Sequence, residues 1–293
     1  PLARELEEFW AATDAEPEKK QAFYDNLSER LTTKFAEVTQ EHTNNGRFGM
    51  SKAGGCTRQA ALKLLGYKPE PFSGSSLFTF ALGHHCEVMA IASLEAIGFT
   101  IDGTQSAVAI DPMMHSYSDG IITGRGLDHI LSVKSTAYKM SGKKNGKWTR
   151  RGFAELVFGG CKENQPGWWA QMQAEMHGSG RKKALLVVVA KDIVKAFEED
   201  EYLGKNGNGS LTFFVEEVDY DETFCRTQLV PAWAQNWNAT LRGQAGPAFY
   251  LSKSGSYVLL DQANTNHMPN ATLTGTFNVC RYCDFINACK EAK

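Results

Sequence analysis

Two stretches close together in the sequence carry charged residues that could act on one ligand: SYSDGII contains Asp119, and ILSVKST contains Lys134. Both stretches are typical of β-strands. Residues two apart on a strand share a face, so carboxylates and a lysine on adjacent strands can converge on one metal ion. Mg2+ prefers oxygen ligands, polarises a phosphate group and helps to generate hydroxide, while a lysine can orient water or stabilise developing charge. These residue types predict a compact Mg2+ site.

Two helical stretches could complete this site. In LGHHCE, the spacing Gly83-x-x-x-Glu87 would place a carboxylate on a helix that faces the strands, and in WWAQMQAEM the residues Gln171 and Gln173 lie on a helix that could cross them. Each residue alone has an ordinary structural explanation, because an Asp-Gly pair is commonly a turn and a lone lysine or glutamine commonly lies at the surface. The order and spacing of the whole set favour a functional site.

In this order, SDG, LSVKST and PGWWAQMQAEMHGSG resemble the motifs of the PD-(D/E)XK nucleases, especially the lambda-exonuclease and RecB-type branch, over about residues 76–192. The resemblance implies a metal-binding aspartate at Asp119, a catalytic lysine at Lys134, an accessory ligand at Glu87, a backbone carbonyl ligand at Val133 and a helix glutamine at Gln171. His84 and His85 adjoin the position of the RecB-type histidine, and the spacing does not choose between them.

One position departs from this family pattern. The family has Glu or Asp two residues before the lysine, and this chain has Ser132, whose uncharged hydroxyl is a poor Mg2+ ligand. Three explanations compete: an engineered inactivating substitution, a natural site in which another carboxylate substitutes, and a degenerate nuclease that only binds. The first is favoured because the surrounding motifs are intact. Asp128 lies roughly 13 Å along an extended strand, too far to substitute without a bulge.

The C-terminal stretch FNVCRYCDFINAC gathers Cys280, Cys283 and Cys289 at the spacing C-x2-C-x5-C. Three close cysteines need a fourth ligand for a tetrahedral Zn2+ or a 4Fe-4S cluster, and Cys56 is the best candidate. This division of cysteines resembles the iron-sulfur site of AddB-type and CRISPR-associated RecB-like nucleases, which favours the 4Fe-4S cluster over zinc. The remaining cysteines are expected to be buried thiols: Cys86, Cys161 and Cys225.

DNA binding would depend on local charge, since the net charge is −2. The stretch 139–152 is basic and lacks acidic residues, and it is equally typical of a solvated loop and of a phosphate-contacting loop. The candidate DNA contacts are Arg58, Lys143, Lys144, Arg150 and Arg151.

The whole chain of 293 residues, 42% hydrophobic and 22% charged, is typical of a globular protein. No apolar run approaches the roughly 18 residues that span a bilayer, no secretory signal is recognised, and the odd number of cysteines favours a reducing compartment, the phage or bacterial host cytoplasm. The expected elements are helices within 1–45, 51–65, 76–97, 166–180 and 222–241, with strands at 106–110, 115–122, 129–136, 183–191 and 211–218.

This order predicts an α/β fold with a restriction-endonuclease-like core, in which helices flank a mixed central β-sheet and a metal cluster joins the N- and C-terminal segments. The expected divisions are a helical N-terminal segment 1–50, a nuclease core 51–265 and a cysteine segment 266–293 that packs with Cys56.

The sequence therefore predicts a DNA exonuclease that hydrolyses phosphodiester bonds with Mg2+ or Mn2+ in phage-type recombination or DNA-end processing, with a structural 4Fe-4S cluster. DNA is the expected partner, and a recombination or single-strand-binding protein is a candidate partner. Ser132 predicts an impaired form that regains cleavage on Ser132→Glu. The alternatives are a non-catalytic DNA-binding protein with a degenerate nuclease core and a zinc-stapled protein-interaction domain.

Overall fold

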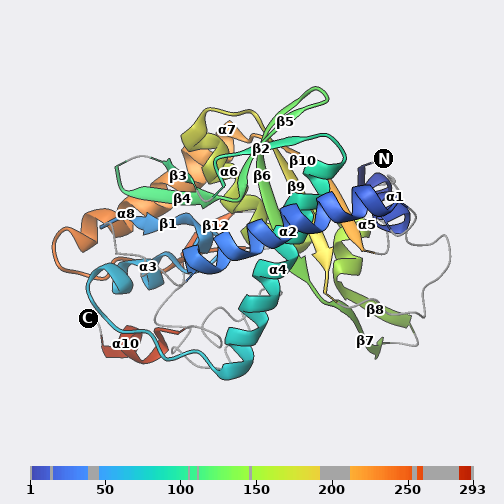
Figure 1. Cartoon of the computed structure of the whole chain (residues 1–293). Coiled ribbons are helices and arrows are strands. Elements are labelled where there is room, and N and C mark those ends of the chain that lie inside the picture. The colour runs from blue at the N-terminus through green and yellow to red at the C-terminus, as the bar shows by residue number, and fades with distance from the viewer. Residues whose placement is uncertain are drawn as a thin grey trace.

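A five-stranded mixed sheet forms the centre of the molecule (Figure 1). Its strand order is β10-β9-β6-β5-β2; β6 and β9 are parallel, and the other neighbours are antiparallel. The strands are β2 (Thr100–Asp102), β5 (Gly120–Gly124), β6 (Leu127–Thr136), β9 (Lys183–Ala190) and β10 (Phe213–Asp219). The computed structural model describes residues 2–13, 16–38, 46–104, 106–110, 112–144, 147–191, 212–252, 256–259 and 284–291.

One face of the sheet is covered by α1 (Leu2–Thr13) and α4 (Gly74–Ala96). Their apolar side chains pack with every second residue of β6 and β9, including Leu131 and Val133. A further helix, α2 (Pro17–Val38), lies against α4. The helices predicted within residues 1–45 are thus present, and they pack onto the body of the protein.

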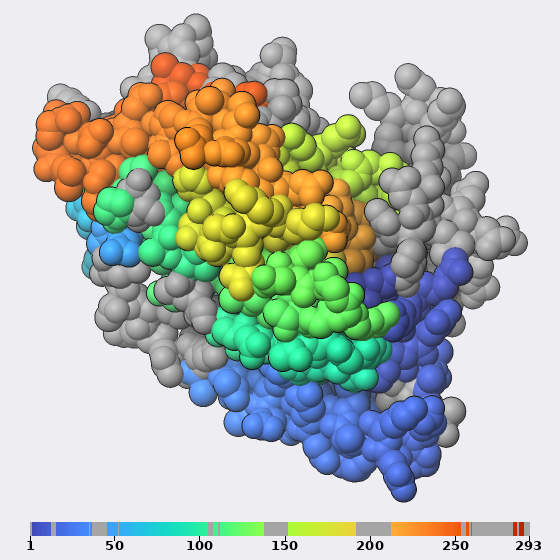
Figure 2. Space-filling view, turned by 90° about the horizontal axis from the view of Figure 1, so that it is seen from above, coloured from blue at the N-terminus to red at the C-terminus, as the bar shows by residue number. Residues whose placement is uncertain are grey.

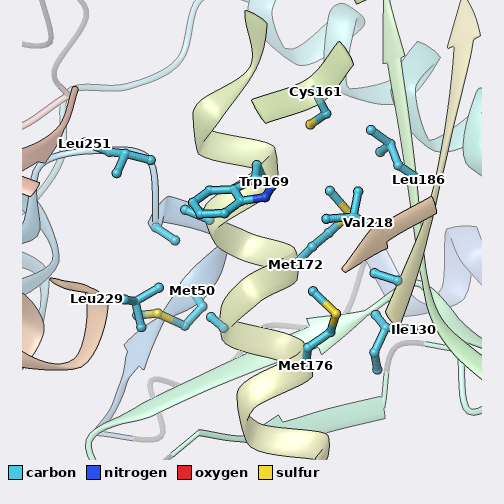
Figure 3. Close-up of a cluster of buried hydrophobic side chains, with 14 of the residues drawn as sticks. Met50, Ile130, Cys161, Trp169, Met172, Met176, Leu186, Val218, Leu229 and Leu251 are labelled. Carbon is cyan, nitrogen blue, oxygen red and sulfur yellow. The ribbon is translucent and has the colours of Figure 1, made fainter. Parts of the chain in front are cut away.

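The opposite face of the sheet is covered by α5 (Phe153–Asn164) and α6 (Pro166–Ser179). Figure 3 shows Met172 and Met176 of α6 among the side chains of this layer, near Ile130. Because strands β6 and β9 are buried on both faces, their sequences are nearly continuous apolar runs. The sheet with helices on both faces confirms the predicted mixed α/β fold. Helix α5 was not predicted.

A further layer lies outside α6. The segment predicted as one helix over 222–241 contains α7 (Glu222–Phe224), the π-helical turn Cys225–Leu229 and α8 (Val230–Thr240). Figure 2 shows these layers as successive bands of colour, from blue through green and yellow to orange. The remaining elements are β1 (Phe48–Gly49), a 3-10 turn (Met50–Lys52), α3 (Thr57–Leu64), β3 (Ser106–Ala109), β4 (Met114–Ser118), β7 (Tyr138–Lys144), β8 (Lys147–Gly152), β11 (Phe249–Leu251), β12 (Tyr257–Leu259) and α10 (Ile286–Glu291).

Helix α4 is by length and composition capable of crossing a membrane, since it has 23 residues and contains an 18-residue window with a mean hydropathy of 1.3. This differs from the expectation that no apolar run is long enough. Its second half is packed in the core, where Ile91 and Leu94 are buried, whereas Leu77 and Phe78 in its first half are 55% and 66% exposed. A buried core helix meets the same criteria of length and composition, so the finding is weak evidence for a membrane span.

Candidate functional site

Asp119 lies at the point where two sheets separate. The stretch 115–122 was predicted as one strand, but it is divided into β4, which pairs with β3, and β5, which pairs with β6. Gly120 has a φ of 153°, and a Cβ there would lie 2.8 Å from Cγ2 of Ile101. The glycine therefore permits the change of direction that leaves Asp119 between the strands.

The carboxylate of Asp119 binds the neighbouring strand β6. The pairing of β5 with β6 ends at Gly120 and Leu131. The next β6 amide on the edge that faces β5 is that of Val133, and it lies beyond the end of β5. It donates instead to Oδ2 of Asp119 at 2.7 Å. The N–H and C=O of one strand residue point to the same side, so the Val133 carbonyl is directed toward this junction.

Lys134 completes this contact from the next residue of β6. Its Nζ lies 3.4 Å from Oδ2 of Asp119, and both side chains are largely buried. Burial raises the pKa of Asp119, an effect that the charge of Lys134 only partly offsets. Burial alone would lower the pKa of Lys134, but the negative charges of Asp119, Glu175 and Glu87 outweigh it and raise that pKa. The lysine is therefore held as a cation.

Glu87 of α4 lies on the other side of this centre, as predicted, but it is paired. Nζ of Lys34, from α2, donates to Oε1 of Glu87 at 2.5 Å, and Nδ1 of His84 lies 3.6 Å from Oε2. Burial raises the pKa of Glu87, but the nearby imidazole of His84 and the charge of Lys34 outweigh it and lower that pKa. His84 is thus the histidine adjacent to the site, while Nδ1 of His85 lies 3.0 Å from the Ala81 carbonyl.

A cavity of about 240 Å³ opens beside this pair, between α2 and α4. Its lining includes Arg30, Lys34 and Glu87. Lys34 was not identified from the sequence, because it lies in a helix whose pattern indicates only packing.

Glu175 of α6 is a second residue that the sequence reasoning missed. Oε1 of Glu175 accepts hydrogen bonds from Ser116 Oγ at 2.6 Å and from Gln171 Nε2 at 2.9 Å. Burial raises its pKa to about 7, with the nearby charge of Lys134 acting in the opposite direction. The available signal was its position four residues after Gln171, which places both side chains on one helix face.

The two glutamines of α6 have different surroundings. Gln171 contacts Glu175 and so borders the site. Gln173 is fully buried and joins α6 to the end of β10, since its amide donates to the Asp219 carbonyl and accepts from the Asp221 amide.

Ser132 lies where the family pattern has an acid. It is 1% exposed, and its Oγ has no hydrogen-bond partner within the described part of the chain. Asp128, considered above as a substitute, is on the same strand but bound to Arg181 Nε at 3.1 Å, with its side chain 70% exposed. It takes no part in the site.

The donor set suits a hard divalent cation only in part. Among the described residues, no three His, Cys, Asp or Glu side chains are gathered into a metal site. Mg2+, however, is commonly bound through one or two carboxylates and keeps several waters. The carboxylate of Asp119 and the Val133 carbonyl fit such a site, as do Oγ of Ser132 and Oε2 of Glu175, which are buried without a hydrogen-bond partner among the described residues.

Half of the predicted cysteine cluster can be located. Cys56 occupies the N-cap position of α3 without a capping hydrogen bond from its side chain, and Cys289 lies in α10, which packs against α3. The segment between α3 and α4 is also linked to the C-terminal segment, because the Glu70 amide donates to the Asp284 carbonyl at 2.7 Å. Cys280 and Cys283 lie outside the described residues. Of the cysteines left unassigned, Cys161 and Cys225 are buried as expected, and Cys86 is partly buried.

Arg58 is placed differently from the prediction of a DNA contact. It is 5% exposed, and its Nη1 donates to the carbonyls of Ala245 and Gly246 at 3.1 Å. A buried guanidinium that already binds carbonyl groups holds α3 to the segment after α8, and this placement argues against a phosphate contact.

The basic stretch 139–152 forms a hairpin of strands β7 and β8, where a loop was expected. Lys139 pairs with Arg151 and Lys144 with Lys147 along its backbone. The hairpin directly follows β6, the strand that carries Lys134. The side chains of Lys143, Lys144, Arg150 and Arg151 lie outside the description.

Comparison with known proteins gives only distant structural likeness. No protein-family model and no curated protein matches the sequence. The chain is similar to LHK-Exo in complex with dAMP (13% identity, TM-score 0.40, 64% of this chain and 85% of that one) and to the alkaline exonuclease LHK-Exo from Laribacter hongkongensis (12%, 0.41, 67% and 87%). It is also similar to SSO0001 (12%, 0.40, 91% and 96%). At these values the likeness carries no functional argument.

Proposed function

We propose that the chain is a DNA exonuclease that hydrolyses phosphodiester bonds with Mg2+ or Mn2+. The observation that carries the proposal is the convergence of Asp119, the Val133 backbone and Lys134 at the junction of the two sheets. A carboxylate, a directed carbonyl and a buried ammonium group in one place are the components that metal-assisted phosphate hydrolysis requires.

In this hypothesis Asp119, Glu87 and the Val133 carbonyl hold the metal. When bound, the metal supplies Lewis-acid polarisation of the phosphate and lowers the pKa of a coordinated water. Lys134 keeps its proton and directs its positive charge at the attacking water or at the phosphoryl oxygen where negative charge develops. Glu87 becomes available once Lys34 moves from Oε1. Gln171 orients the adjacent side chain Glu175.

The proposed substrate is DNA, with the hairpin of β7 and β8 as the phosphate-contacting element. Its basic residues are Lys143, Lys144, Arg150 and Arg151, and the hairpin follows the strand of Lys134 without an intervening element. A DNA duplex held along it would lie beside the site. Phage-type recombination or DNA-end processing in the cytoplasm, with a recombination or single-strand-binding protein as partner, is the proposed setting.

Ser132 favours a second candidate function, a DNA-binding protein whose nuclease core has lost activity. The position that would hold an acid on β6 bears a hydroxyl group, which is a poor Mg2+ ligand. In that case the chain would bind end-labelled DNA without shortening it.

Lys134→Met tests the catalytic proposal. We expect an end-labelled duplex to be shortened by the wild type in Mg2+ or Mn2+, and about a thousandfold more slowly by the variant, because the charge at the reacting phosphate is lost. Lys183→Met is the matched control, since Lys183 lies on the neighbouring strand β9 and pairs with Glu217 at the surface. Equal rates for the Lys134 variant and wild type, or no cleavage by wild type in either metal, would contradict the proposal.

We further propose a structural 4Fe-4S cluster held by Cys56, Cys280, Cys283 and Cys289, with Zn2+ as the alternative. The packing of α10 on α3 supports it, because the elements of Cys56 and Cys289 are adjacent. The cluster would stabilise the protein by joining distant parts of the chain. We expect close to four irons and four sulfides per anaerobically purified chain. Cys289→Ser should lose them and Cys225→Ser, a buried thiol elsewhere, should keep them; zinc without iron would establish the alternative.

A further inference from the structure

We propose that Glu175 of α6 takes the place of the acid missing at Ser132, as a carboxylate ligand of the divalent cation. This inference rests on the nuclease function proposed above. It explains how a chain with serine at this position keeps a complete set of carboxylates.

The register of the sheet places Ser132 opposite α6. Ser132 of β6 pairs with Leu186 of β9, and parallel partners direct their side chains to the same face. Leu186 packs in the layer formed by α6, near Met172 (Figure 3). An acid at position 132 would therefore have pointed at the layer that contains Glu175.

Lys134 lies on the same face of β6 as Ser132, two residues later. Its Nζ lies 3.4 Å from Oδ2 of Asp119, and Glu175 is close enough for its charge to contribute to the raised pKa of the lysine. The lysine is thus the common neighbour of the two carboxylates, one from the strand junction and one from α6. Glu175 approaches Lys134 from α6, whereas an acid at position 132 would approach it from β6.

The carboxylate of Glu175 is positioned but only half used. The residue is 0% exposed, and Ser116 and Gln171 both donate to Oε1. Oε2 has no hydrogen-bond partner within the described residues. A buried carboxylate oxygen without a partner is costly, and a cation or its coordinated water at this place would remove that cost.

Ser132 has the properties of a residue that makes room for this arrangement. Its side chain is small, its Oγ is buried without a partner in the described chain, and α6 packs directly against β6. A glutamate at position 132 would enter the space between β6 and α6 and bring a third negative charge toward Asp119 and Glu175. The serine is then part of a working site, and no inactivating substitution is needed to explain it.

The test is a titration of the metal-free full-length protein with Mn2+ alone by calorimetry, alongside cleavage of an end-labelled duplex. Glu175→Gln keeps the size of the side chain and an oxygen that accepts from Ser116 and Gln171. We expect about tenfold weaker Mn2+ binding and about a hundredfold slower cleavage. Glu175→Asp, which retains the acid on a shorter side chain, should give intermediate values.

Glu216→Gln is the matched control. Glu216 is a partly buried carboxylate on β10 whose Oε2 accepts from the Cys161 amide, so its loss imposes a comparable cost outside the site. It should bind Mn2+ and cleave DNA as the wild type does. Ser132→Glu should raise cleavage no more than a few-fold, whereas a gain of a hundredfold or more would overturn the proposal and support inactivation at Ser132.

The outcomes separate this inference from the function on which it rests. If the wild type binds Mn2+ and cleaves DNA while a folded Glu175→Gln variant equals it in both, Glu175 is not a ligand and the nuclease proposal stands. If the wild type neither binds Mn2+ nor cleaves, both proposals fall. Should Glu175→Gln not fold, unchanged Mn2+ affinity in Glu175→Asp would overturn the inference by itself.

Discussion

Two glutamates, the partly buried Glu87 and the fully buried Glu175, approach Asp119 from opposite faces of the central sheet, and their surroundings differ in kind. Glu87 comes from α4 and is bound by Lys34 and His84, which together lower its pKa despite burial. Glu175 comes from α6 and is bound by the uncharged donors Ser116 and Gln171, and burial raises its pKa to about 7. Figure 1 shows α4 and α6 on the two sides of β6.

The difference shows that two glutamates near one aspartate are held in different ways, one by charged groups and one by uncharged donors. On the α4 side, Glu87 is paired with the ammonium group of Lys34, which would have to move before Glu87 could bind a metal as proposed. If Glu175 binds the cation as proposed, it would release its proton on binding, since metal binding releases protons from its ligands.

Lys34→Met should have the largest effect on stability. It leaves Glu87 buried without its ammonium partner, and we expect a loss of about 3 kcal/mol, at the lower end for a broken buried pair because His84 remains. The same change removes the competitor for Glu87, so Mn2+ should bind more tightly. Urea unfolding and Mn2+ calorimetry measure the two effects.

Lys19→Met serves as the control for this prediction. Lys19 lies on the same helix, and its pair with Glu16 is exposed, so its loss should change the unfolding free energy by less than about 1 kcal/mol. Unchanged stability in Lys34→Met would show that the ion pair does not hold Glu87.

The pH dependence of the folding stability of the metal-free protein tests the environment of Glu175 on the α6 side. The folded pKa of Glu175, about 7, is above its ordinary value of 4.5, so its protonated form favours folding. The resulting stability is fully present below about pH 4.5 and is lost as the pH rises through 7, by on the order of 2 kcal/mol between pH 5 and 8. Glu175→Gln should remove this decline in urea unfolding measured at each pH. A decline of equal size in the variant would assign it to other groups.

The sequence predicted the parts of the site that depend on local pattern. Turn signals between strand-like runs predicted the strand of Lys134 and one strand through Asp119, which the structure divides into β4 and β5. The spacing Gly83-x-x-x-Glu87 predicted that Glu87 lies on a helix. Lys34 could not be predicted, because its contact with Glu87 depends on how α2 packs on α4. Arg58 was assigned to DNA because a basic residue beside a cysteine gives no sign of burial. Helix α5 was not predicted, because the pair Gly159-Gly160 is unfavourable inside a helix. In the structure Gly160 adopts a non-helical φ of 73° within α5.

Ser116→Ala should have the smallest effect on stability of these changes, and it tests how much the Ser116 hydroxyl contributes to positioning Glu175. Removing one of the two donors to Oε1 should cost about 1 kcal/mol of stability at pH 8, where the carboxylate is charged, and less at pH 5. Because the hydroxyl stabilises the charged form, its loss should move the pH-dependent decline in stability to higher pH. Thr227→Ala, which removes an exposed hydroxyl that donates to the Thr223 carbonyl, is the control. If the decline stays where it is in the wild type, Gln171 alone positions Glu175, and the contribution of β4 to the site is limited to packing.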